Sequence, residues 1–223
     1  MPVLAQSPFI EAIEHLAPNT TLCAADVPWE DYEQLLEDLG EDYAGRVFYD
    51  QGKLEIMSPP TKEHEIPKPI IYRLIVVLSE ELDLEISSVG TTTLRRLRKS
   101  GAEPDDAYYI RDIGPALGGG NLDLERNPPP HIVLEIDHTS SSLDKFAIYA
   151  NLGVPEIWRV AKGAVSFHHL NANFYTETHL SRAFPFLDST LLTGFLNLGL
   201  REGETKAAKA FRLWLRERQP TLD

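Results

Sequence analysis

The 223-residue sequence predicts a mixed α+β fold in which a mixed sheet is flanked by helices. Two segments, 46–57 and 156–170, alternate apolar and polar residues on either side of a turn, which is typical of β-hairpins. Other segments, which begin near residues 29, 68 and 204, repeat apolar residues at helical spacing. Neither an internal repeat nor a low-complexity tract interrupts the pattern, so these elements alone define the fold class.

The N-terminal part is expected to contain two helices and one hairpin. Residues 1–25 hold a short apolar repeat, and Pro28 opens a longer helix. Asp26 is a candidate N-cap for that helix, and Gly40 is expected to end it. The 46–57 hairpin follows.

A long core helix is expected to start near residue 68. Pro67 and Pro69 precede its apolar repeat, and an interior proline forfeits a backbone hydrogen bond. Extended runs at about 85–89, 91–97 and 105–110 come next. Residues 111–130 hold three consecutive glycines and three consecutive prolines, so a long loop is expected, and such loops are usually functional or mobile.

The C-terminal half is expected to alternate strands and helices. A strand at 132–137 leads to a helix at about 143–152, the hairpin 156–170 and a terminal helix near 204–218. As domains, we expect an N-terminal extension (1–25), a main domain (26–200) and a C-terminal helix (201–223) that packs on the domain or on a partner.

Composition and charge limit the function classes. The net charge of −13 and the pI near 5.0 give little non-specific phosphate affinity, because that affinity comes from Lys and Arg. This counts against a nucleic-acid enzyme unless a local basic patch or a metal supplies the attraction. Cys23 is the only cysteine, so no intrachain disulfide can form and a reducing cytoplasm is expected. No apolar stretch approaches a membrane span, and the N-terminus lacks a secretory signal.

An acidic strand carries the clearest functional signal. Alternation along 132–137 puts Val133, Glu135 and Asp137 on one face and the other three residues, all apolar, on the opposite face. Two carboxylates on one face of an apolar strand are costly to bury unless a cation lies between them. Oxygen ligands favour Mg²⁺ or Mn²⁺ over zinc. The alternative is an edge strand with one wet face, which would leave both acids solvated.

A set of residues in fixed order carries a family resemblance. It reads Gly52-x-Leu54-x-Ile56-Met57-Ser58-Pro59-Pro60, His64, Pro104-Asp105, Glu135, Asp144-Lys145, and Tyr149-Ala150-x-x-Gly153-Val154-Pro155-Glu156-x-Trp158. Over roughly residues 26–170 this set resembles the Uma-two family of restriction endonucleases, a branch of the PD-(D/E)XK nuclease superfamily. The resemblance implies a restriction-endonuclease-like core whose mixed sheet presents an Asp, a Glu and a Lys for metal-dependent phosphodiester cleavage.

The resemblance also assigns roles. Asp105 matches the motif Asp and Glu135 the motif Glu, both as Mg²⁺ (or Mn²⁺) ligands, with the carbonyl of Ile136 as an extra ligand. Lys145 matches the lysine that this branch places on the next helix. Asp137 stands where the superfamily has a strand lysine, and it is either a third metal ligand or a solvated residue.

Further candidates are a carboxylate, a histidine and a basic cluster. Glu55 lies on the first hairpin. His64, just before the core helix, either accepts a proton or contacts phosphate, or is a surface histidine without a role. The basic cluster is expected to grip a nucleic-acid backbone, unless it only balances nearby acids; it comprises Arg95, Arg96, Arg98 and Lys99.

Together these features predict a Mg²⁺-dependent DNA endonuclease in the cytoplasm. A homodimer is expected, because superfamily enzymes that cut both strands often pair. Two alternatives remain open: a nuclease-like fold kept as a binding or assembly module without cleavage, and a metal-dependent hydrolase of another phosphoester. The acidic charge and the missing strand lysine favour the module, whereas Asp105, Glu135 and Lys145 favour the enzyme.

Overall fold

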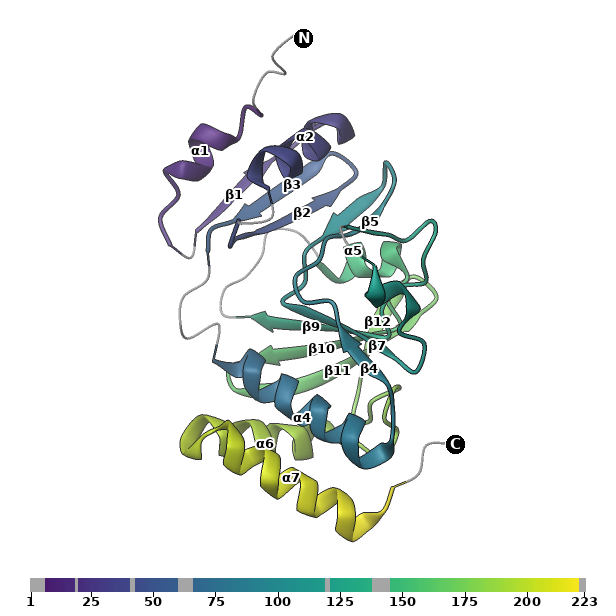
Figure 1. The fold of residues 1–223 in the computed structure, drawn as a ribbon. Helices are drawn as coiled ribbons and strands as arrows, with labels where there is room; N and C mark the ends of the chain where they lie inside the picture. The colour runs from purple at the N-terminus through teal and green to yellow at the C-terminus, as the bar shows by residue number, and fades with distance from the viewer. Residues whose placement is uncertain are drawn as a thin grey trace.

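The computed structural model describes residues 7–18, 20–40, 43–59, 66–118, 121–137 and 145–220. Within them, the chain forms two six-stranded sheets with helices between them and on both outer sides (Figure 1). The α+β class predicted from the sequence is confirmed. The strands divide into two sheets, however, where one mixed sheet was expected.

The N-terminal sheet consists of β1 (Thr21–Ala24), β2 (Arg46–Asp50), β3 (Lys53–Met57), β5 (Leu94–Arg96), β6 (Ser100–Ala102) and β8 (Leu122–Asp123). Its order is β1-β3-β2-β6-β5-β8, and every pair is antiparallel except β5–β8. On its outer face, α2 (Trp29–Leu39) packs Tyr32 and Leu35 against Val47 and Ile56. The short α1 (Ile10–Glu14) lies beside α2.

The C-terminal sheet consists of β4 (Ile86–Ser88), β7 (Asp106–Ile110), β9 (Ile132–Asp137), β10 (Glu156–Ala161), β11 (Ala164–Asn171) and β12 (Phe174–Thr178). Its order is β12-β11-β10-β9-β7-β4, with β9–β10 the parallel pair. Its outer face is covered by α4 (Pro67–Leu82), α6 (Ser189–Glu202) and α7 (Glu204–Arg218). α7 packs on α4 and α6.

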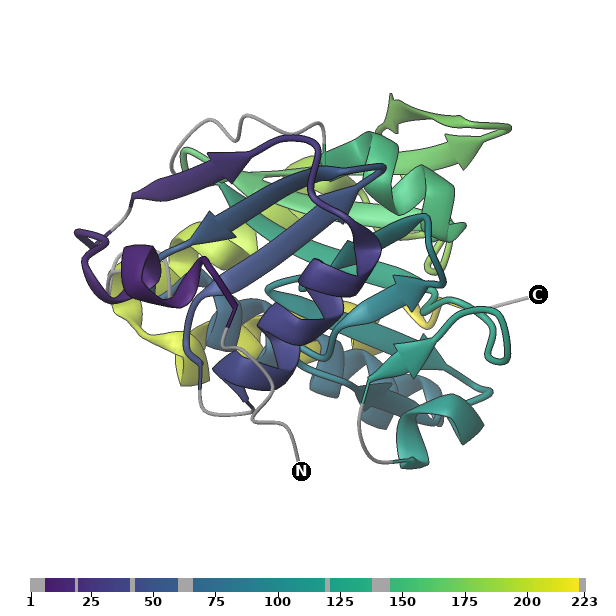
Figure 2. The same cartoon turned by 90° about the horizontal axis from the view of Figure 1, so that it is seen from above.

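α5 (Lys145–Leu152) lies between the two sheets. Its buried residues Ile148, Tyr149 and Leu152 share one hydrophobic cluster with Phe48 of the N-terminal sheet and Val133 of the C-terminal sheet. Figure 2 shows the N-terminal sheet lying across the C-terminal one, with the β11–β12 hairpin projecting to one side. The helix thus brings its first residue, Lys145, to the layer where the sheets meet.

β9 is a central strand, and this decides how its acids are placed. Ile132, Leu134 and Ile136 face the cluster under α4, whereas Val133 faces the cluster around α5, so the predicted alternation is confirmed. Because β7 and β10 flank β9, the edge-strand alternative is wrong. Glu135 is only 2% exposed.

α4 starts at Pro67, in agreement with the expected start near residue 68, because a proline in the first turn loses no helical hydrogen bond. β7 starts at Asp106, one residue after Asp105. The predicted cap Asp26 is wrong: Pro28 precedes α2 without a side-chain cap, and Asp26 adopts a left-handed φ of 56°. Gly40 ends α2 as predicted.

Several elements were missed. The strands β1, β6, β8 and β12, the helix α6 and a 3₁₀ turn (Gly114–Leu117) were not expected. The turn and β8 lie in the predicted loop 111–130. The terminal helix is confirmed at the predicted residues. The predicted helix start at 143 lies outside the described residues. No helix in the described ranges is long and apolar enough to cross a bilayer.

Candidate functional site

Glu135 is the centre of a buried polar cluster between the sheets. Its Oε2 accepts a hydrogen bond of 2.9 Å from Nζ of Lys145, and its Oε1 accepts one from the Tyr149 hydroxyl. Asp105, which directly precedes β7, accepts a 2.8 Å hydrogen bond from the backbone N–H of Ile136, the next residue along β9. The structure therefore brings together the three residues, Asp105, Glu135 and Lys145, that the motifs singled out.

Burial and neighbouring charges shift the pKa values of Glu135 and Lys145. Burial raises the pKa of Glu135, Lys145 opposes this, and the charge of Asp105 raises it further, so that the pKa lies at about 7. Burial lowers the pKa of Lys145, but Glu135 and the other nearby acids outweigh burial and leave it raised. Lys145 therefore stays protonated, while Glu135 titrates near neutrality. Two close carboxylates of which one resists ionisation form a site that favours an added cation.

Tyr149 belongs to the site but was not predicted as a site residue. It follows Lys145 by four positions, so both side chains leave the same face of α5. Burial and the Glu135 charge raise the pKa of Tyr149 well above its usual value, so its hydroxyl stays a donor. The four-residue spacing was the sequence signal that could have indicated it.

Arg46 is the second residue that the sequence did not indicate. It starts β2, and its Nη2 lies 3.7 Å from Oδ1 of Asp105. Its side chain is 12% exposed. No local pattern links Arg46 to Asp105, because only the packing of the two sheets brings them together. Arg46 therefore adds a second cation, besides Lys145, close to the carboxylates.

Glu55 faces the same layer. The register of β2 and β3 pairs it with Phe48, and directly paired residues share a face of a sheet. The Lys145 ammonium lies 4.5 Å from the centroid of the Phe48 ring, so Glu55 lies on the Lys145 side of its sheet. Glu55 is fully buried. Its catalytic role stays a prediction.

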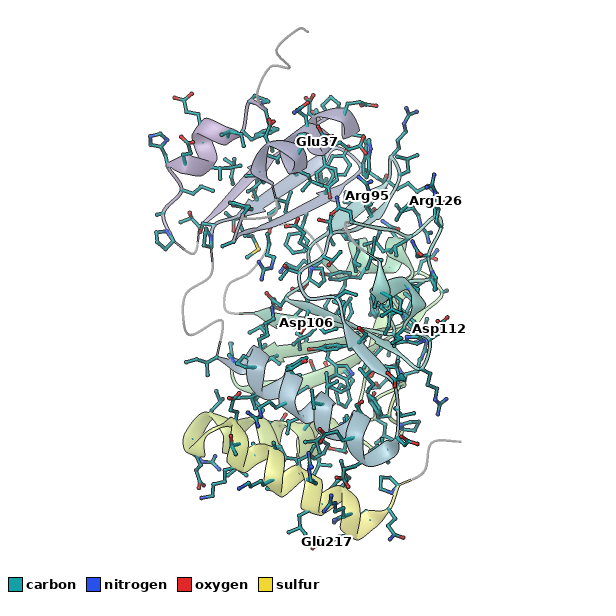
Figure 3. All side chains as sticks on the ribbon, viewed as in Figure 1. Glu37, Arg95, Asp106, Asp112, Arg126 and Glu217 are labelled. Atoms are coloured by element: carbon teal, nitrogen blue, oxygen red, sulfur yellow. The ribbon has the colours of Figure 1, made fainter. Side chains whose placement is uncertain are left out.

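Asp106, which is labelled in Figure 3 and directly follows Asp105, has different hydrogen-bond partners. Its carboxylate accepts four hydrogen bonds, from the Ser88 and Tyr108 hydroxyls and from the N–H groups of Gly90 and Ala107. These bonds tie β7 to β4 and the loop that follows β4. Asp105 is therefore close to Glu135, whereas Asp106 connects β7 to the edge strand β4.

Asp137 pairs with Arg159 across the parallel β9–β10 ladder, with 2.5 Å between Arg159 Nε and Asp137 Oδ2. Its side chain is 23% exposed. Metal ligation by Asp137 and by the Ile136 carbonyl stays a prediction. His64 lies outside the described residues.

The basic cluster lies on the β5–β6 hairpin, and its arginines face acids. Arg95 approaches Glu33 at 3.4 Å, Arg96 approaches Glu125 at 3.9 Å, and Arg98 approaches Glu30 at 4.0 Å. Figure 3 labels Arg95, which belongs to β5 of the N-terminal sheet. This geometry agrees with the alternative of a balanced surface, and nucleic-acid binding by the cluster, including Lys99, stays a prediction.

Asp105 and Glu135 are the side chains of this cluster that could bind a metal ion. No group of three His, Cys, Asp or Glu side chains suited to a metal occurs in the described ranges. Mg²⁺, however, is typically held by one or two carboxylates, with water and substrate phosphate completing its shell. Asp105 and Glu135, both nearly buried, supply such a pair, so the site fits Mg²⁺ or Mn²⁺.

A two-sheet α+β fold that buries an Asp, a Glu and a Lys together has the arrangement that the nuclease resemblance implies. The chain matches the Uma2 family model, described as "Putative restriction endonuclease", over residues 29–201, and it belongs to this family. The resemblance to this family that was drawn from the motifs is confirmed.

The fold is also similar to a crystal structure from Anabaena variabilis ATCC 29413, described as "a putative nuclease belonging to DUF820". The two chains are 14% identical and superpose with a TM-score of 0.49, over 76% of this chain and 99% of the other. No curated protein matches the chain.

Proposed function

We propose that this protein is a metal-dependent nuclease that hydrolyses phosphodiester bonds of DNA. The observation that carries the proposal is the buried Asp105–Glu135 pair with Lys145 on Glu135. Although Lys145 contacts Glu135, burial and the charge of Asp105 keep the pKa of Glu135 at about 7, so further positive charge beside the pair would be favourable. Membership of a family described as restriction endonucleases supports the reaction class.

Asp105 and Glu135 would hold Mg²⁺ or Mn²⁺. When bound, such an ion lowers the pKa of a coordinated water and neutralises charge on phosphate oxygens. Lys145 would orient the attacking water and stabilise the anionic transition state, because its ammonium lies 2.9 Å from Oε2 of Glu135. Tyr149 would fix the orientation of Glu135 through its hydrogen bond.

The test is nicking of a supercoiled plasmid in Mn²⁺, with Glu135→Ala and Lys145→Ala alongside the intact protein. We expect nicking by the intact protein and a loss of about 10²–10³ in rate for each variant, the usual cost of removing one such group. Nicking that survives Glu135→Ala would point to a contaminating nuclease and overturn the proposal.

One observation favours the second candidate, a binding or assembly module without cleavage. Asp137 stands where the superfamily has its strand lysine, and it forms an ion pair with Arg159. A module of this kind would show no nicking of DNA in Mn²⁺ or Mg²⁺, whereas a hydrolase of another phosphoester would act on RNA or on a small phosphodiester substrate.

A further inference from the structure

We propose that Arg46 contacts a non-bridging oxygen of the scissile phosphate. The inference rests on the proposed function and adds a substrate-contacting residue to it. The residue lies far from the carboxylates in sequence, and its place in the cluster is visible only in the folded chain.

The guanidinium of Arg46 is anchored by backbone. Its Nη1 donates to the carbonyls of Ala44 and Gly45, at 3.2 and 2.8 Å. Both carbonyls belong to the segment directly before β2, so the head group is fixed relative to the sheet. A planar group that is fixed in this way loses little entropy when it binds a further partner.

The other side of the guanidinium is not satisfied by Asp105. The 3.7 Å between Nη2 and Oδ1 exceeds hydrogen-bond distance, so the contact is an ion pair only. The buried Nε has no hydrogen-bond partner within the described ranges. Buried N–H groups without partners are costly, and Arg presents its N–H groups in a fork that matches phosphate oxygens. The arrangement therefore fits an anion that arrives beside Asp105.

Arg46 and Lys145 each form an ion pair with one carboxylate of the pair. Arg46 and Phe48 alternate onto the same face of β2, and the Phe48 ring lies under the Lys145 ammonium. One cation thus faces Asp105 and the other contacts Glu135.

The test uses the intact chain with Arg46→Ala and Arg46→Lys, and with Arg201→Ala as a matched control on the exposed end of α6. Plasmid nicking in Mn²⁺ should fall by about 10²–10³ in Arg46→Ala and recover only in part in Arg46→Lys, because an ammonium lacks the fork. The Mn²⁺ affinity of both Arg46 variants, measured by calorimetry, should stay within about threefold of that of the intact protein. A tenfold change would correspond to about 1.4 kcal/mol. Arg201→Ala should match the intact protein in both.

Two results would overturn the inference. Full nicking by Arg46→Ala would show that no phosphate contact is needed, and loss of Mn²⁺ binding in Arg46→Lys would show that Arg46 only positions Asp105. An inactive intact protein would contradict the proposed function instead. In that case a DNA duplex bound in Ca²⁺ still tests Arg46, since Arg46→Ala should weaken binding by about tenfold, the equivalent of one charge-assisted hydrogen bond.

Discussion

The raised pKa of Glu135 results from its burial and from the groups that surround it. It has one ammonium, one hydroxyl and a second carboxylate nearby, and water is almost excluded. A fully solvated Glu would need none of these partners. Its protonation state decides whether the site can bind a cation.

Metal affinity should depend on pH through Glu135. Its pKa of about 7 means that it is largely protonated at pH 6 and largely ionised at pH 8. A cation binds the ionised form and displaces the proton, so Mn²⁺ affinity should rise about tenfold between these pH values and then level off. Calorimetry in two buffers of different ionisation enthalpy measures both the affinity and the proton released. An affinity that does not change over this window would contradict the assignment.

Removal of the Tyr149 hydroxyl should destabilise the protein and shift the same titration. Tyr149→Phe keeps the ring packing but deletes a donor to Glu135, which should cost about 1.5–3 kcal/mol of unfolding free energy. Since this hydrogen bond lowers the pKa of Glu135, the pH dependence of Mn²⁺ binding should move upward.

Urea unfolding and calorimetry check both effects. Tyr109→Phe, which loses only a bond to the neutral Pro128 carbonyl, is the matched control and should cost about 1 kcal/mol without moving the titration. Equal effects of the two substitutions would show that the charge of Glu135 is not involved.

Among the secondary-structure elements, those that depend only on their own residues could be predicted from the periodicity of the sequence. The 46–57 and 156–170 hairpins, α2, α4 and α7 follow from alternation or helical repeats in their own residues. The faces of β9 also followed, because Ile132 and Glu135 obey the two-residue period.

Pairing between distant segments could not be predicted in this way. β6 has three residues and joins β2 only because Phe48 meets Ala102 across the sheet, which no local pattern reveals. The same limit hid Arg46, whose partner Asp105 comes from the other side of the sheet interface. The motif residues were found because their order along the chain matches a family, which is independent of the register.

Glu156 shows that a motif residue can be structural. It is fully buried in β10 and accepts hydrogen bonds from the Trp158 indole, the Ser181 hydroxyl and the N–H groups of Arg182 and Ala183. It thereby ties the centre of the C-terminal sheet to the segment that leads into α6. The Glu and Trp of the Pro155-Glu156-x-Trp158 motif are bonded to each other, which explains their spacing.

Glu156→Gln should therefore lower stability without changing Mn²⁺ affinity. A Gln amide accepts on one oxygen only and turns a donor towards the remaining N–H groups, so about 2–3 kcal/mol should be lost. Urea unfolding compares it with Glu177→Gln, an exposed position on β12 where less than about 0.5 kcal/mol is expected. A loss of Mn²⁺ binding in a folded Glu156→Gln protein would contradict the structural role.

At the scale of the whole molecule, the net charge of −13 limits how DNA can be held. The arginines of the β5–β6 hairpin are each near a glutamate, so their attraction for phosphate is partly cancelled. If these arginines contact the DNA backbone, removal of the competing acids should strengthen binding.

We expect Glu30→Gln with Glu33→Gln to raise DNA affinity and to steepen its dependence on salt concentration, because freed arginines displace more counterions. Fluorescence anisotropy with a DNA duplex in Ca²⁺, at several salt concentrations, measures both. Glu11→Gln with Glu14→Gln makes the same charge change at α1 and should have a smaller effect. Equal effects of the two pairs would mean that only net charge matters and that the hairpin is a balanced surface.

The most direct measurement is Mn²⁺ binding by calorimetry to Asp105→Asn and Asp106→Asn. The two substitutions are adjacent and chemically identical, but Asp105 meets Glu135 whereas Asp106 is held by four hydrogen bonds at the sheet edge. Asp105→Asn should abolish binding in a folded protein, and Asp106→Asn should lower stability while binding is kept. Binding that survives Asp105→Asn, or that is lost only in Asp106→Asn, would contradict a metal site built on Asp105 and Glu135.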